Sequence, residues 1–153
     1  MDFAIVKTLH ILSATVLFGT GLGTAFFMWR ANLSGDVRVI ASVAKQVVLA
    51  DWLFTTPTVI FQPLSGAWLV YTAGHAWTGW VAYSLGLYLL AAMCWLPVVW
   101  LQLRMRDIAL SAAERNQPLP PSYSRYARTW FWLGVPAFLA IGGVFFLMVL
   151  KHI

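Results

Sequence analysis

The chain has 153 residues, of which 61% are hydrophobic and only 10% are charged, and its net charge is +5. Because soluble domains normally contain about 25% charged residues, this composition excludes an ordinary soluble protein and indicates one integral membrane domain over residues 1–153. The apolar runs are continuous rather than alternating, which favours membrane-spanning helices. The positive charge is gathered in two loops, a pattern typical of membrane orientation and not of nucleic-acid binding.

Four membrane spans are predicted in chain order, each long enough for a hydrocarbon layer that needs about 20 helical residues. They cover about residues 3–29, 43–72, 77–103 and 130–150, and the membrane part of the second span starts near Asp51. Tryptophans near the expected ends are typical of an aromatic belt. The predicted fold class is therefore all-α, a polytopic membrane protein with a four-transmembrane-helix bundle.

The distribution of Lys and Arg predicts how the spans are oriented. The loop after the first span carries Arg30, Arg38 and Lys45, and the loop before the last span carries five further arginines, whereas the loop between the second and third spans carries neither residue type. The positive-inside rule then places both basic loops in the cytoplasm and both termini outside. All histidines of the chain fall on the outer side in this topology: His10, His75 and His152.

The first span contains two residues that are unusual in a hydrophobic segment. Residues 5–18 read IVKTLHILSATVLF, and Lys7 and His10 are three positions apart, so they share one helix face. Small residues, including Ser13 and Ala14, continue the same face. Since helices in membranes approach one another through small residues, His10 is predicted to point into the bundle.

The second span carries a polar stripe and two prolines. Its polar residues recur at offsets of four, three, four and three, so they share one face over about 21 Å. Pro57 and Pro63 lie in the same segment and disfavour a regular helix there. The stripe is interpreted either as a cavity lining for a substrate, a proton or a cofactor edge, or as local hydrogen bonding around the kinks. Its members are Asp51, Thr55, Thr58, Gln62 and Ser65.

A neutral imidazole inside a helical bundle is the usual axial ligand of a b-type haem. Lys7, one turn nearer the surface, would then suit a haem propionate, and His75 is the candidate for the other axial position because its short loop could fold over the bundle. His10 and His75 are also the candidate ligands for copper or zinc. A single hydrogen bond between helices is the alternative role for His10. The cofactor-binding candidates are His10, Lys7, Ser13, Ala14 and His75.

Three segments carry a family resemblance: IVKTLHILSATVLFGTGL in the first span, FTTPTVIF in the second, and YSRYARTWFWLGVPAFLAIGGVFFLMVLK in the last. They resemble the HemJ-type protoporphyrinogen oxidases. The chain is more similar still to an uncharacterised bacterial family of predicted integral membrane proteins, domain of unknown function 2269, allied to HemJ-type and CopD-like membrane proteins. The resemblance implies four helices in a bacterial inner (cytoplasmic) membrane and, for the HemJ branch, a haem b bound through His10.

The chain departs from the HemJ pattern at two basic positions. It has no lysine early in the third span, where it reads WVAYSLGLYLL, and no arginine shortly before Thr-Thr-Pro. The resemblance therefore implies the scaffold and the histidine rather than protoporphyrinogen oxidation. We expect haem-dependent electron transfer or oxidation and reduction of a membrane-soluble substrate, with the lipid bilayer, a quinone or another membrane redox protein, and a second copy of the chain as partners. The alternatives are a CopD-like copper-handling protein and a non-catalytic subunit of a membrane complex.

Overall fold

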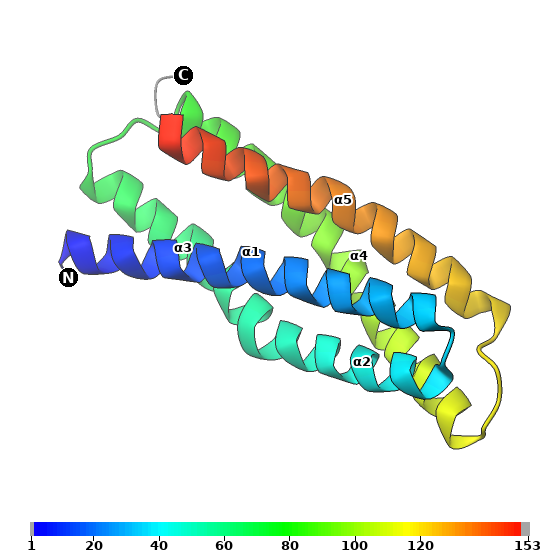
Figure 1. The fold of residues 1–153 in the computed structure, drawn as a ribbon. Helices are drawn as coiled ribbons and strands as arrows, with labels where there is room; N and C mark the ends of the chain where they lie inside the picture. Colours follow the sequence, from blue (N-terminus) through cyan, green and yellow to red (C-terminus); the bar gives the residue numbers. More distant parts are fainter. Residues whose placement is uncertain (1, 151–153) are drawn as a thin grey trace.

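The computed structural model describes residues 2–150, so His152 lies outside the described residues. Every regular element in this part of the chain is helical, as Figure 1 shows. The elements are α1 (Phe3–Ser34), α2 (Val37–Ala50), the π-helical turn η1 (Asp51–Thr55), α3 (Thr56–Thr72), α4 (Trp80–Glu114) and α5 (Pro121–Leu150). The predicted all-α class is confirmed.

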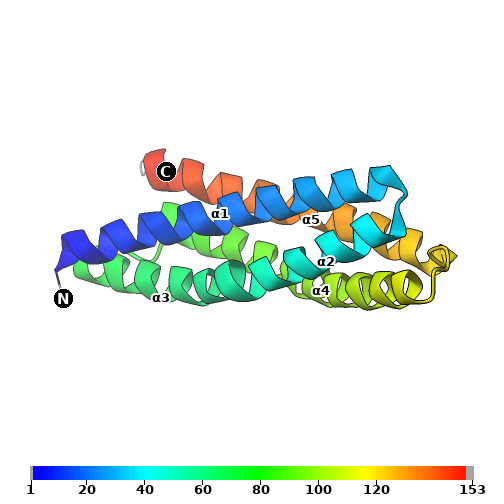
Figure 2. The same ribbon diagram turned by 60° about the horizontal axis from the view of Figure 1, so that its bottom comes forward.

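The helices form an elongated bundle whose two ends differ. The start of α1, the end of α5 and the connection from α3 to α4 lie at one end, which we call the terminal end (Figures 1 and 2). The α1–α2 and α4–α5 connections lie at the other end, which we call the basic end because it carries Arg38 and Arg115. Helices α4 and α5 pack along one another, and α1 packs beside α2, η1 and α3.

Three helices, α1, α4 and α5, are long and apolar enough to cross a membrane. The second predicted span is not one regular helix, because it is divided among α2, η1 and a 17-residue α3. Pro57, the second residue of α3, lies just after η1 and explains the division. Proline has no N–H to donate, and in a regular helix its ring collides with the carbonyl four residues earlier. The wider π turn moves this carbonyl away from the proline ring.

The helices also extend beyond the predicted spans at the basic end. Helix α1 continues to Ser34 and stops at Gly35, whose φ of 67° lies in the left-handed region that favours glycine. Helix α5 begins at Pro121 and not near residue 130, because proline is favoured in the first helical turn. The predicted bounds were too short here because hydropathy marks the lipid-facing part, whereas capping residues determine where the helix ends.

The main core of buried side chains lies toward the basic end. Met28, Ile40 and Met105, from α1, α2 and α4, are at most 2% exposed. Two side-chain hydrogen bonds join the connections there: Tyr123 Oη donates to Asn32 Oδ1 over 2.7 Å, and Arg38 Nη2 donates to Asn116 Oδ1 over 2.8 Å. The full cluster comprises Met28, Ala31, Ile40, Ala41, Ala44, Val47, Val98, Leu101, Met105, Ala109, Tyr123 and Trp130.

The packing at the basic end predicts a large difference between two methionines of α4. Met105 is 1% exposed in the core, whereas Met93 is 66% exposed on the outer surface of the bundle. Met105→Ala should lower the free energy of unfolding by about 2–5 kcal/mol, since it leaves a cavity among immobile neighbours. Met93→Ala is the matched control and should change it little. Equal losses in reversible detergent unfolding would contradict this placement of the core.

Candidate functional site

His10 lies at the interface between α1 and α3. Its side chain is 7% exposed. Gln62 Nε2 donates a hydrogen bond to the backbone oxygen of His10 over 2.9 Å, and Ser65 Oγ lies 2.7 Å from His10 Nδ1. A Cβ atom added at Gly66 would be 3.4 Å from His10 Cε1, an ordinary van der Waals distance, so the imidazole packs against α3 at Gly66. The prediction that His10 points into the bundle is confirmed.

The hydrogen bonds of Ser65 favour one tautomer of His10. The Ser65 hydroxyl has a single hydrogen, and its oxygen lies 2.6 Å from the Phe61 carbonyl, to which it donates. This bond favours the arrangement in which the same oxygen accepts from His10 Nδ1–H. A neutral His10 then carries its hydrogen on Nδ1 and a free electron pair on Nε2. Histidines that bind metals are usually oriented in this way, by donating the other ring N–H to an acceptor.

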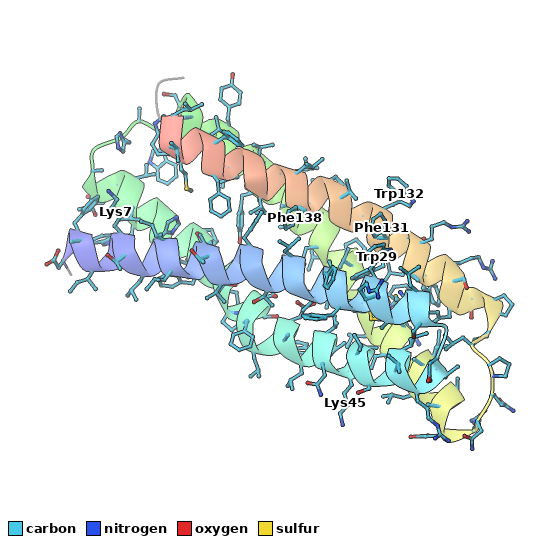
Figure 3. All side chains as sticks on the ribbon, in the orientation of Figure 1. Lys7, Trp29, Lys45, Phe131, Trp132 and Phe138 are labelled. Atoms are coloured by element: carbon cyan, nitrogen blue, oxygen red, sulfur yellow. The ribbon has the colours of Figure 1, made fainter. Side chains whose placement is uncertain are left out.

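The other candidate residues of the first span differ from one another in burial and in hydrogen bonding. Ser13 Oγ is buried and has no hydrogen-bond partner among the described residues. Ala14, next to it, is half-buried. Lys7 is exposed near the terminal end of α1, where Figure 3 labels it, and makes no ion pair with any residue from 2 to 150. The Lys7 ammonium is thus available to an anionic group outside the described chain.

His75 lies in the exposed connection between α3 and α4. Its ring packs edge-on against Trp80, with 5.5 Å between the ring centroids. The structure thus places His10 beside Gln62 and Ser65, whereas the ring partner of His75 is a tryptophan at the start of α4. Within residues 2–150, no three His, Cys, Asp or Glu side chains are grouped so that they could hold a metal ion.

The polar stripe of the second predicted span divides into two parts. Asp51 and Thr55 are buried in η1, where Thr55 Oγ1 donates to Asp51 Oδ1 over 2.8 Å. Gln62 and Ser65, farther along in α3, contact His10 instead. Thr58 of α3, between the two parts, donates to the Phe54 carbonyl of η1, one turn earlier, over 2.7 Å.

A cavity of about 350 Å³ lies among α1, η1, α4 and α5. Asp51 and Thr55 line it, whereas Thr58, Gln62, Ser65 and His10 do not. The cavity and the histidine are therefore separate places in the bundle.

Three further polar residues of the cavity lining come from α4 and α5. Tyr88 Oη donates to the Val59 carbonyl and joins α4 to α3. Gln102 is 7% exposed beside Asp51, and sequence reasoning missed it, although a glutamine inside an apolar run just before Arg104 was a usable signal. Trp130, expected in an interfacial belt, is instead 5% exposed.

Long apolar helices with polar groups held inside the bundle define the class as a helical integral membrane protein. Residues 4–152 match the family described as "Predicted integral membrane protein (DUF2269)", and the chain belongs to this family. The predicted membrane family and contact with a lipid bilayer are thereby confirmed. Comparisons with curated proteins and with solved structures found no match.

The bond from Gln62 to α1 predicts a specific stability effect. Gln62→Leu removes the hydrogen bond to the His10 carbonyl and should lower the free energy of unfolding by about 0.6 kcal/mol, the average for hydrogen bonds between membrane helices. Thr58→Val is the control, since within residues 2–150 the Thr58 hydroxyl donates to the preceding turn, at Phe54 and Thr55 of η1, and not to α1. Unfolding of both variants in mixed micelles tests this, and a smaller loss for Gln62→Leu than for Thr58→Val would refute it.

Proposed function

We propose that the protein binds haem b through Nε2 of His10 and acts in electron transfer or in oxidation and reduction of a membrane-soluble substrate, as the likeness to HemJ-type proteins implies. One observation carries the proposal: Ser65 Oγ, which donates to the Phe61 carbonyl, lies 2.7 Å from His10 Nδ1, and this arrangement favours Nδ1–H as the donor and Nε2 as the free ligand nitrogen. A porphyrin supplies the in-plane ligands of iron, so one protein imidazole suffices. Copper or zinc needs several protein ligands, and a lone His10 fits haem better.

The residues around His10 suit a haem in several respects. Ser13 and Ala14 are small, and the unpartnered Ser13 hydroxyl is a free hydrogen-bonding group one turn from the histidine. Lys7 can extend its ammonium toward the membrane surface, where a haem propionate would lie. When bound, the haem supplies one-electron chemistry. Ser65 fixes the orientation of the imidazole, and Gln62 holds α1 against α3.

We further propose that α2, η1 and α3 together form a fourth crossing and that both termini lie outside the cytoplasm. The terminal end of the bundle holds both the start of α1 and the end of α5, as an even number of crossings requires (Figure 1). The opposite end carries most of the basic residues, which favours the cytoplasmic side for it. In this topology His10 and Lys7 lie in the outer part of the membrane.

The haem proposal predicts the spectra of variants purified after expression with added haem. His10→Ala should abolish the Soret band because the variant lacks the axial imidazole. Lys7→Ala should retain the band with weaker haem retention, because only a propionate contact is lost. Ser65→Ala should keep haem but bind it less tightly, by about 10-fold or more, because the imidazole loses its orienting acceptor.

His75→Ala serves as the comparison for the second axial position. Its exposed place beside Trp80 predicts an unchanged Soret band, and a change from low to high spin would identify His75 as a ligand. Wild-type protein without Soret absorbance, or a His10→Ala variant with the full wild-type spectrum, would contradict haem binding through His10.

The topology is tested independently of the cofactor. Alkaline phosphatase fused after Ile153 should be active, because it folds only outside the cytoplasm, and green fluorescent protein fused at the same position should be dark. A fusion of either reporter within the connection between α4 and α5 provides the inverse control. A fluorescent carboxyl-terminal fusion would refute the proposed orientation.

A further inference from the structure

The cavity among α1, η1, α4 and α5 is long and opens toward lipid. Its lining on α5 extends from Trp130 to Ile141, about 16 Å along the helix axis at a rise of 1.5 Å per residue. Leu22 of α1 and Leu139 of α5 belong to the lining, and they are 53% and 69% exposed on the outer surface of the bundle. The cavity therefore opens between α1 and α5, and its long direction follows helices that are long enough to cross a membrane.

The interior of the cavity suits an apolar group. Phe131 and Phe138 belong to its lining and project from α5 on the side that faces α1 (Figure 3). Asp51 is the single Asp, Glu, Lys, Arg or His in the lining, and its carboxylate is already hydrogen-bonded by Thr55 and Gln102. Since Asp51 has no cation beside it in the lining, the interior accepts a hydrocarbon group and repels an anion.

One arginine on each long helix marks the limit of the hydrocarbon layer at the basic end. No Asp, Glu, Lys or Arg occurs in residues 8–29 of α1, 80–103 of α4 or 129–150 of α5. Each stretch exceeds the about 20 residues that a hydrocarbon layer requires. The arginines that end these stretches toward the basic end are Arg30, Arg104 and Arg128. All three side chains are exposed, so their guanidinium groups lie near the depth of the lipid phosphates.

Two of these arginines flank the basic end of the cavity. Arg128 lies three residues before Phe131, so the two residues share one face of α5. On α1, Ala25 is the last residue of the lining, and Trp29 and Arg30 follow about one turn later. Figure 3 shows Trp29 on the side of α1 that faces α5. Neither arginine makes an ion pair with any residue from 2 to 150, so both guanidinium groups are available to phosphate oxygens, which arginine binds in bidentate geometry.

We propose that the cavity holds an acyl chain of an anionic phospholipid whose phosphate binds Arg128 and Arg30. An acyl chain is apolar throughout and lies along the membrane normal, which is the long direction of the cavity. The two arginines attract the phosphate at one end, and the Asp51 carboxylate repels it from the interior, so the charges give the lipid one orientation. A phosphatidylcholine has the same chain and phosphate, but its ammonium group is repelled by the two arginines. The charges therefore favour an anionic headgroup.

This lipid site does not depend on the proposed haem, because His10 is absent from the cavity lining. His10→Ala should leave lipid binding unchanged, so the two proposals can fail separately. The lipid site also requires only that the basic end reaches a membrane surface, whichever side of the membrane that surface faces.

The experiment uses the full chain in dodecyl maltoside micelles, with palmitoyl-oleoyl phosphatidylglycerol as the probe. A ligand that binds only the folded state raises the thermal unfolding midpoint in a saturable way. Phosphatidylglycerol should raise this midpoint at lower concentrations than phosphatidylcholine with the same acyl chains. Glycerol phosphate has the phosphate without acyl chains and should produce no shift. Equal effects of the two lipids, no saturable shift with either, or a full shift with glycerol phosphate would overturn the proposal.

Arg128→Gln tests the contact with the headgroup. It should raise the phosphatidylglycerol concentration needed for half of the shift about fivefold, the effect of one basic residue near anionic lipid, and should affect phosphatidylcholine less. Arg104→Gln is the matched control and should change neither response. Arg104 is exposed at the same boundary, but its guanidinium lies over Trp100, 5.4 Å from the ring centroid. Two residues separate it from the lining residue Gln102, which places it on the opposite side of α4. Equal losses in the two variants, or no loss in Arg128→Gln, would contradict the headgroup contact.

Gly134→Leu and Gly21→Leu test the place of the acyl chain. Both glycines line the cavity, and a Cβ at either one meets no atom within 4 Å, so a leucine side chain would occupy the space of the acyl chain. Both variants should weaken the response to both lipids. Gly19→Leu is the matched control, since Gly19 also has open space but is exposed outside the lining. An undiminished response in a cavity variant with wild-type helical content would overturn the proposal, and the two arginine variants decide the outcome even if a leucine variant does not fold.

Discussion

The packing at the basic end is the constraint on which the rest of the bundle depends. Tight burial of Met28, Ile40 and Met105 fixes three helices against one another there, where the connections are also joined by side-chain hydrogen bonds. Farther along the bundle, α1 pairs with α3 and α4 pairs with α5, and α1 and α5 make few close backbone contacts. Contacts such as the Phe18–Phe138 stack join the two pairs. This change in packing along the axis leaves the cavity of about 350 Å³ between them.

Pro57 has a second consequence besides interrupting a helix. The π turn before it inserts an extra residue relative to a regular α-helix, which rotates the helix on one side of the turn relative to the other. Asp51 and Thr55 can therefore face the cavity while Gln62 and Ser65 face α1. One polar stripe in the sequence thus supplies two different places, a carboxylate in a lipid-facing cavity and an orienting acceptor for the buried histidine.

Hydropathy and spacing predicted much of this arrangement. The three spans formed by α1, α4 and α5, and the inward direction of His10, follow from continuous apolar runs and from the small residues on one face of the first helix. The partner of His10 did not follow, because a single sequence does not show which helix will lie opposite. Periodicity assumes a regular helix, so it could not show that η1 divides the stripe after Thr55. The burial of Trp130 was also missed, since tryptophan near a span end is typical of the interface.

The His10 site and the cavity differ in the charges of their residues as well as in their position. His10 offers a neutral nitrogen ligand with the exposed cation Lys7 one turn away, and this pairing suits a group that combines a metal with carboxylates. The cavity among α1, η1, α4 and α5 has one acid, Asp51, and no cation in its lining, so it does not suit an anionic group. A polar group enclosed by membrane helices is costly unless it has a partner. Asp51 has only neutral partners within the described chain, and Trp130 Nε1 has none. Thr55 and Gln102 therefore reduce the cost of burying the Asp51 carboxylate without an ion pair among the described residues.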